Sequence, residues 1–95
     1  MMYLVSEVQC HSEEVMNKRF KLFSNKEDAQ KYFDELKELW IHDLCEDLDC
    51  SVFELESYAE TYFAGTYFNN SSLWNYISVD GTLEVEIELT ELEVY

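Results

Sequence analysis

The chain has 95 residues, enough for one domain and too few for two, so we expect a single acidic domain over residues 1–95. Hydrophobic residues make up 47% and aromatic residues 16%, with no proline and two glycines, which excludes a disordered or collagen-like chain. No apolar run reaches the ~18 residues of a membrane span, and no secretory signal pattern opens the chain. We therefore expect a cytoplasmic protein that does not bind membranes.

Two strands are expected first. Residues 2–9 are rich in β-branched and aromatic types, and residues 15–23 alternate charged with apolar side chains around Phe20. The polar segment 10–14 lies between them, and the pattern predicts a hairpin with 10–14 as its loop.

A helix is predicted over residues 25–46. Ser24 and Glu27 have the spacing of a capping box, in which each side chain satisfies a free backbone N–H. Behind them, apolar residues recur at the i, i+3, i+4 spacing of an amphipathic helix. Ser51 begins a second capping box, which predicts another helix over 52–63, although the alternation of Phe53 and Leu55 with acidic residues also suits a strand.

The chain ends in a second predicted hairpin, with strands at 73–79 and 82–95 around Asp80-Gly81, a pair that type I′ turns favour. The alternation of apolar and acidic residues slips near Thr90, which predicts a β-bulge or a strand break there. The order ββααββ indicates an α+β fold: a four-stranded antiparallel sheet with one or two helices on one face.

Charge is the most informative part of the composition. The chain has 21 acidic and 6 basic residues, for a net charge of −15. All the cations lie between residues 18 and 37, whereas residues 38–95 hold 14 acidic residues and no Lys or Arg. This asymmetry argues against direct binding to nucleic acid and favours a cationic partner. Solubility alone is the alternative reading.

The acidic residues predict two contact surfaces. Along the last strand, Glu84, Glu86 and Glu88 share one face at about 6.8 Å spacing. At the end of the first predicted helix, carboxylates oppose the helix dipole. These helix residues are Asp43, Glu46, Asp47 and Asp49. An array of anions can occupy a groove that binds phosphates, although both sets also suit a solvated outer face.

Aromatic residues between 58 and 76 supply candidate anchors for a partner. We assign this role to Tyr67 and Trp74, because such side chains combine an apolar body with a polar edge and bind Arg through cation–π contacts. Packing in the core is the alternative reading for both residues.

The sequence lacks the parts of a metal or catalytic site. Its soft ligands form one Cys-x4-Cys pair, Cys45 and Cys50, with no second pair, and we expect these two and Cys10 to be reduced thiols. His42 and Cys45 share a helix face, the one arrangement a Cys–His enzyme could use. We expect no enzyme, no catalytic residues, no metal and no cofactor.

The segment LFSNKEDAQKYF, residues 22–33, together with the acidic C-terminal strand resembles small proteins of phages and mobile elements. Acidic single domains of this size are also similar to anti-CRISPR proteins and other phage anti-defence inhibitors. The resemblance implies an inhibitor that binds the basic nucleic-acid groove of a host nuclease, in the cytoplasm of an infected bacterium. The resemblance assigns no function to any individual residue of this chain.

Two alternatives stay open. An immunity protein or antitoxin for a basic toxin would use the same charge pattern. A homo-oligomeric structural module, in the simplest case a homodimer, would use the acidic residues for solubility only.

Overall fold

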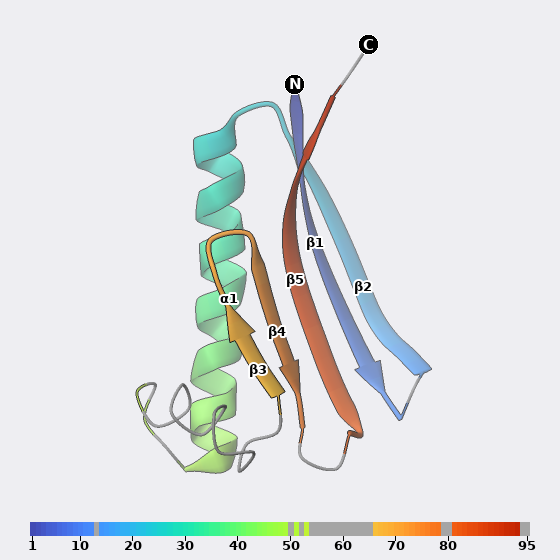
Figure 1. Ribbon diagram of the computed structural model, residues 1–95, viewed down its shortest axis with the longest axis vertical. Helices are drawn as coiled ribbons and strands as arrows, with labels where there is room; N and C mark the ends of the chain where they lie inside the picture. The colour runs from blue at the N-terminus through green and yellow to red at the C-terminus, as the bar shows by residue number, and fades with distance from the viewer. Residues whose placement is uncertain (13, 50, 52, 54–65, 79–80, 94–95) are drawn as a thin grey trace.

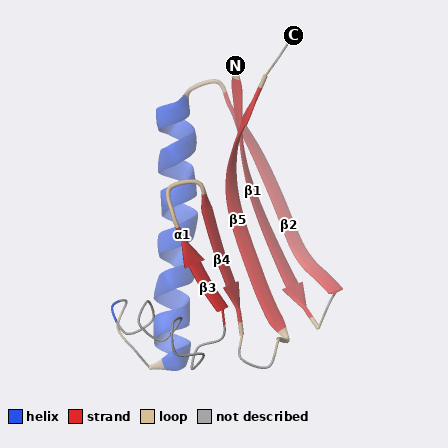
Figure 2. Ribbon diagram, viewed as in Figure 1, coloured by secondary structure: helices blue, strands red, loops and turns tan. Residues whose placement is uncertain are grey.

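The computed structural model describes residues 1–12, 14–49, 51, 53, 66–78 and 81–93. It is an α+β fold with a single helix among those residues and one five-stranded antiparallel sheet in the order β2-β1-β5-β4-β3 (Figures 1 and 2). In chain order the elements are β1 (Met2–His11), β2 (Glu14–Phe23), α1 (Lys26–Leu48), β3 (Thr66–Asn69), β4 (Leu73–Ile77) and β5 (Leu83–Leu92). The α+β class is thus confirmed, whereas the predicted four-stranded sheet is wrong.

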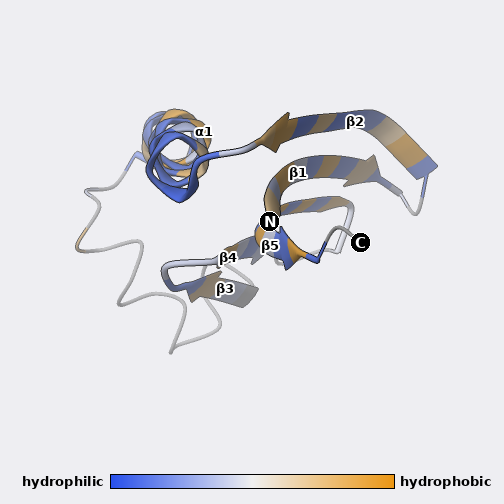
Figure 3. Cartoon of the chain, turned by 90° about the horizontal axis from the view of Figure 1, so that it is seen from above, coloured by the Kyte–Doolittle hydropathy of each residue, from blue (hydrophilic) through white to orange (hydrophobic). Residues whose placement is uncertain are grey.

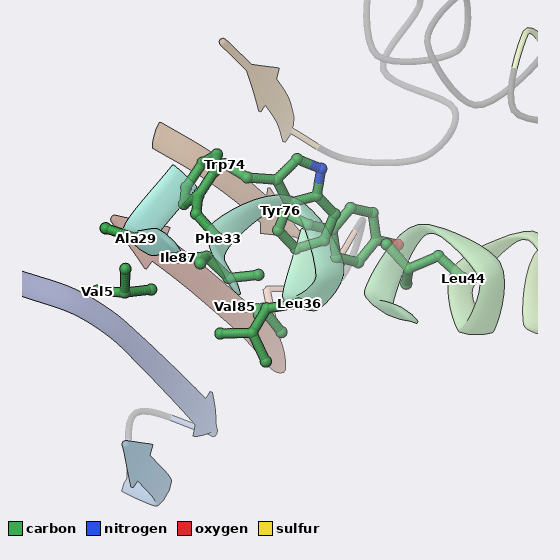
Figure 4. Close-up of a cluster of buried hydrophobic side chains, with 9 residues drawn as sticks. All are labelled: Val5, Ala29, Phe33, Leu36, Leu44, Trp74, Tyr76, Val85 and Ile87. Atoms are coloured by element: carbon green, nitrogen blue, oxygen red, sulfur yellow. The ribbon is translucent and has the colours of Figure 1, made fainter. Parts of the chain in front are cut away.

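The helix α1 lies along one face of the sheet, as the view from above shows (Figure 3). Alternate side chains of the strands point toward α1 because successive residues of a strand face opposite ways. Phe33 is fully buried between α1 and the sheet, against a cluster drawn from β1, β4 and β5 (Figure 4). In the described part of the chain, the core residues are Val5, Ala29, Phe33, Leu36, Leu44, Trp74, Tyr76, Val85 and Ile87.

The strand that the sequence analysis missed is β3. It pairs antiparallel with β4, with Tyr67 opposite Tyr76. Four residues are too few to show an alternating pattern, so Thr66–Asn69 does not stand out from the loop signals around it. This strand forms one edge of the sheet and places β5 in the middle.

The helix begins one residue later and ends two residues later than predicted. Its N-cap is Asn25, whose Oδ1 accepts hydrogen bonds from the backbone N–H of Glu27 at 2.7 Å and of Asp28 at 3.4 Å. The predicted cap at Ser24 is therefore wrong: Asn and Ser cap about equally well, and Asn25 stands next to the first helical residue. Asp49 closes the other end in the left-handed conformation.

The strands of both predicted hairpins pair antiparallel. In the first, β1 and β2 extend to His11 and Glu14, so the connection is shorter than 10–14, and the register shifts between Gln9 and Cys10. In the second, the N–H of Gly81 donates to the carbonyl of Ser78 at 2.9 Å. Gly81 has φ +74°, and Asp80, the other residue of the predicted type I′ pair, lies outside the described residues.

The bulge predicted near Thr90 is not found in the β1–β5 ladder, which runs without a register shift from Met2–Leu92 to His11–Leu83. The apparent slip has another cause. Glu91, opposite Tyr3, is exposed at the end of the sheet, so an acidic residue is tolerated on the helix side there. Leu92, opposite Met2, lies on the other face.

Apart from Phe53, the residues of the predicted helix over 52–63 lie outside the described part of the chain. Among the described residues, no helix is both long and apolar enough to cross a bilayer.

Candidate functional site

One face of the sheet is turned away from α1, and we call it the open face. Its members follow from the strand registers and the alternation of side chains. At its centre they are Ser6, Val8, Phe20, Leu22, Leu73, Asn75, Ile77, Glu84, Glu86 and Glu88. Hydrophobic and hydrophilic bands alternate along β1, β2 and β5 (Figure 3). No described element packs on this face.

Glu84, Glu86 and Glu88, here called the glutamate ladder, run along the middle strand of this face. Because β5 is the central strand, the ladder has uncharged neighbours on both sides: Glu86 stands opposite Val8 of β1 and Asn75 of β4. The ion pairs among described residues involve none of the three glutamates. The ladder is therefore an uncompensated row of negative charge.

The middle residue of the ladder shows the electrostatic cost. Partial burial raises the pKa of Glu86, and the negative charges of Glu88 and Glu84 raise it further. Each of these causes disfavours the ionised form. A cation placed over Glu86 would act in the opposite direction and favour ionisation.

Exposed apolar side chains lie two strands away from the ladder. On the edge strand β2, Phe20 is 58% exposed and Leu22 is 56% exposed. The ammonium of Lys18 lies 5.0 Å from the centre of the Phe20 ring. Lys18 is opposite Val8, which is opposite Glu86, so cation, apolar residue and anion form one row across three strands. This mixed surface suits a partner with both charged and apolar groups.

The acidic residues at the end of α1 form a separate surface on the helix side of the sheet. Asp43, Glu46, Asp47 and Asp49 are all exposed, and no basic residue stands in the last turn. The structure therefore does not join them to the glutamate ladder, since the sheet lies between the two sets.

The two predicted aromatic anchors are not on the open face. Trp74 is 0% exposed and belongs to the core, so its prediction as a partner contact is corrected (Figure 4). Tyr67 is partly buried and meets Trp74 edge to face, with ring centroids 5.9 Å apart. The alternation that places Tyr76 toward α1 also places these two residues there. On the open face, the exposed aromatic residues are Phe20 and Phe68.

One group of described residues could offer ligands to a metal ion: the side chains of His42, Asp43 and Glu46 have ligand atoms within 4.8 Å of one another. All three are exposed, and the imidazole lies 3.7 Å from Glu46 and 4.0 Å from Asp43. Such contacts arise on any acidic helix face with a histidine. Cys10 and Cys45 are partly buried free thiols, and Cys50 lies outside the described residues.

A second site, which the sequence analysis missed, is built around Glu7. This residue is 5% exposed and lies on the helix side of β1. Its Oε2 accepts a 3.0 Å hydrogen bond from the indole Nε1 of Trp40, and its Oε1 lies 3.5 Å from Nε of Arg19. The sequence did contain a signal for this site: Glu7 continues the alternation of Tyr3 and Val5, which predicts that position 7 is buried, and yet it is charged.

Comparison with known proteins gives no relative: no protein-family model, no curated protein and no solved structure matches this chain significantly.

Proposed function

We propose that this protein is an inhibitor that covers the basic, nucleic-acid-binding surface of another protein with the open face of its sheet. The partner class that fits best is a nuclease of a bacterial defence system. The observation that carries the proposal is the glutamate ladder, three carboxylates in the middle of a sheet face on which no described element packs, without an ion pair to any described residue.

Electrostatics favours a cationic occupant of this face. Partial burial raises the pKa of Glu86 and repulsion from Glu88 and Glu84 raises it further; Lys or Arg side chains over the ladder would offset this repulsion. The net charge of −15 would also speed the encounter with a basic surface and slow it with nucleic acid.

The size of the open face is adequate for a specific contact. Three strands of ten residues and two shorter ones cover on the order of 600 Å² in projection, from a strand spacing of about 4.8 Å and a rise of about 3.4 Å per residue. One partner of a typical complex contributes about 800 Å² of accessible surface. Because side chains project from the sheet, the accessible surface of the open face is larger than its projected area and can supply this amount. Phe20 and Leu22 provide the apolar part of the contact.

The spacing of the ladder decides how it would compete with nucleic acid. Its carboxylates repeat at about 6.8 Å, whereas each DNA strand carries a phosphate every 3.4 Å or so along the helix axis. The ladder therefore reproduces the sign of a nucleic-acid strand but not its charge density. The protein would therefore compete with nucleic acid by covering the basic surface of the partner as well as by its negative charge.

The test is capture of partners from bacterial lysate by the immobilised chain, followed by displacement with duplex DNA and a nuclease assay of the captured protein. We expect a basic nucleic-acid-binding protein that DNA displaces and that this chain inhibits. Recovery of a partner that DNA does not displace would favour the immunity-protein alternative. Recovery of the chain alone would contradict the proposal and favour the homo-oligomeric module.

A further inference from the structure

A pocket of about 210 Å³ lies between α1, β1 and β2, on the side of the sheet opposite the glutamate ladder. Glu7 lines it together with Leu36, Leu39, Trp40, Asp43 and Arg19. Its lining thus combines a buried carboxylate, a second carboxylate on α1, an indole ring and two leucines. It is independent of the surface to which the function was assigned.

The buried carboxylate is only partly compensated. Placing an ionised carboxylate at 5% exposure costs several kcal/mol unless it is paired and hydrogen-bonded. Among the described residues, the cation that pairs with Glu7 is Arg19, whose side chain is 60% exposed and whose Nε is 3.5 Å away. Charge-assisted N–H···O bonds have optimal lengths of about 2.7–2.9 Å, so this contact is long. A better-placed cation would bind more strongly.

We infer that this pocket binds a guanidinium group, which pairs with Glu7 and takes the place of Arg19. A guanidinium fits for three reasons. It is planar and stacks on an indole such as Trp40, it is more weakly hydrated than an ammonium, and its several N–H groups can reach a second carboxylate at Asp43. Arg19 already presents the same group at the pocket, and its exposure leaves it free to move out.

The guanidinium can belong to a small molecule or to an arginine side chain of a protein. The direct probe is Nα-acetylarginine methylamide, titrated into the protein while the indole N–H signals of Trp40 and Trp74 are followed by NMR. Trp40 lines the pocket and should shift, whereas Trp74 is a core residue and should not. We expect saturation with a dissociation constant on the order of 1 mM, as for a small ligand. The lysine analogue should bind more weakly, and the uncharged citrulline analogue should leave Trp40 unshifted.

Variants separate binding from a purely structural role of the pair. Arg19→Gln removes the internal competitor and should tighten binding several-fold, whereas Asp43→Asn should weaken it. Glu7→Gln should abolish the shift, and the Trp74 signal reports whether that variant is folded. Glu35→Gln, which makes the same change of charge at an exposed α1 position outside the pocket, is the matched control and should have no effect.

Three results would overturn the inference: no saturable shift of Trp40, an equal shift with the citrulline analogue, or unchanged affinity in Arg19→Gln. A further titration, with an arginine-containing peptide, identifies the source of the guanidinium group. If an arginine-containing peptide binds at least tenfold tighter than the amino-acid derivative, the natural ligand is an arginine side chain of a protein. If it binds equally, the natural ligand is a small guanidino compound.

Discussion

The indole Nε1 of Trp40 donates a 3.0 Å hydrogen bond to Oε2 of Glu7, which ties the middle of α1 to the middle of β1 across 33 positions of the chain. Trp40→Phe would keep an aromatic ring and remove the donor, leaving a buried carboxylate oxygen unpaired. We expect the free energy of unfolding to fall by ~1–3 kcal/mol, measured by urea denaturation. In a Glu7→Gln background the same substitution should cost less, and an equal cost would show that the bond contributes nothing.

The start of α1 gives a second prediction. Because Asn25 accepts hydrogen bonds from the N–H groups of Glu27 and Asp28, Asn25→Ala should lower the free energy of unfolding by ~1 kcal/mol. Ser24→Ala is the matched control, one residue outside the cap, and should change stability by less than ~0.5 kcal/mol. If thermal unfolding shows a larger loss of stability for Ser24→Ala than for Asn25→Ala, the cap is at Ser24.

A third prediction concerns stability and pH. Since the pKa of Glu86 is raised in the folded protein, the folded state binds this proton more tightly than the unfolded state, and the charged form opposes folding. Glu86→Gln should therefore stabilise the protein at neutral pH, by less than ~1 kcal/mol because the group is partly solvated. The gain should vanish as pH falls below the ordinary carboxyl pKa of 4.5. If the gain in stability persists at low pH, it comes from packing and not from the removal of the charge.

The same shift predicts how binding depends on pH. A cationic partner favours ionised Glu86, so its affinity should rise as pH increases through the raised pKa of this residue and then level off. In Glu86→Gln the rise should be smaller. An identical pH profile in the variant, measured by calorimetry, would exclude Glu86 from the contact.

The local pattern was sufficient to predict the first two strands, the helix, the last hairpin and the face on which Glu84, Glu86 and Glu88 lie. That the ladder runs along the middle strand of this face could not be predicted, because it depends on the insertion of β5 between β1 and β4. The sequence distinguished the two acidic surfaces, but it is the position of α1 that places them on opposite sides of the sheet.

The burial of individual residues was the least predictable feature. Trp74 and Tyr67 have the amphipathic character of interface anchors. Both nevertheless face α1, because Trp74 is two residues before the core residue Tyr76 on β4 and Tyr67 is opposite Tyr76 on β3. Glu7 stands at a core position of β1, but its partners Arg19 and Trp40 come from other elements, so no local signal could pair them.

The central claim is that the glutamate ladder, rather than the overall negative charge, contacts the partner. The direct measurement is the affinity of the captured partner for two variants with equal net charge, E84Q/E86Q/E88Q on the open face and E27Q/E35Q/E38Q on the exposed side of α1. We predict a loss of at least ~tenfold, about 1.4 kcal/mol, in the first variant and less than ~threefold in the second. Equal losses in both variants, or none in the first, would contradict this account.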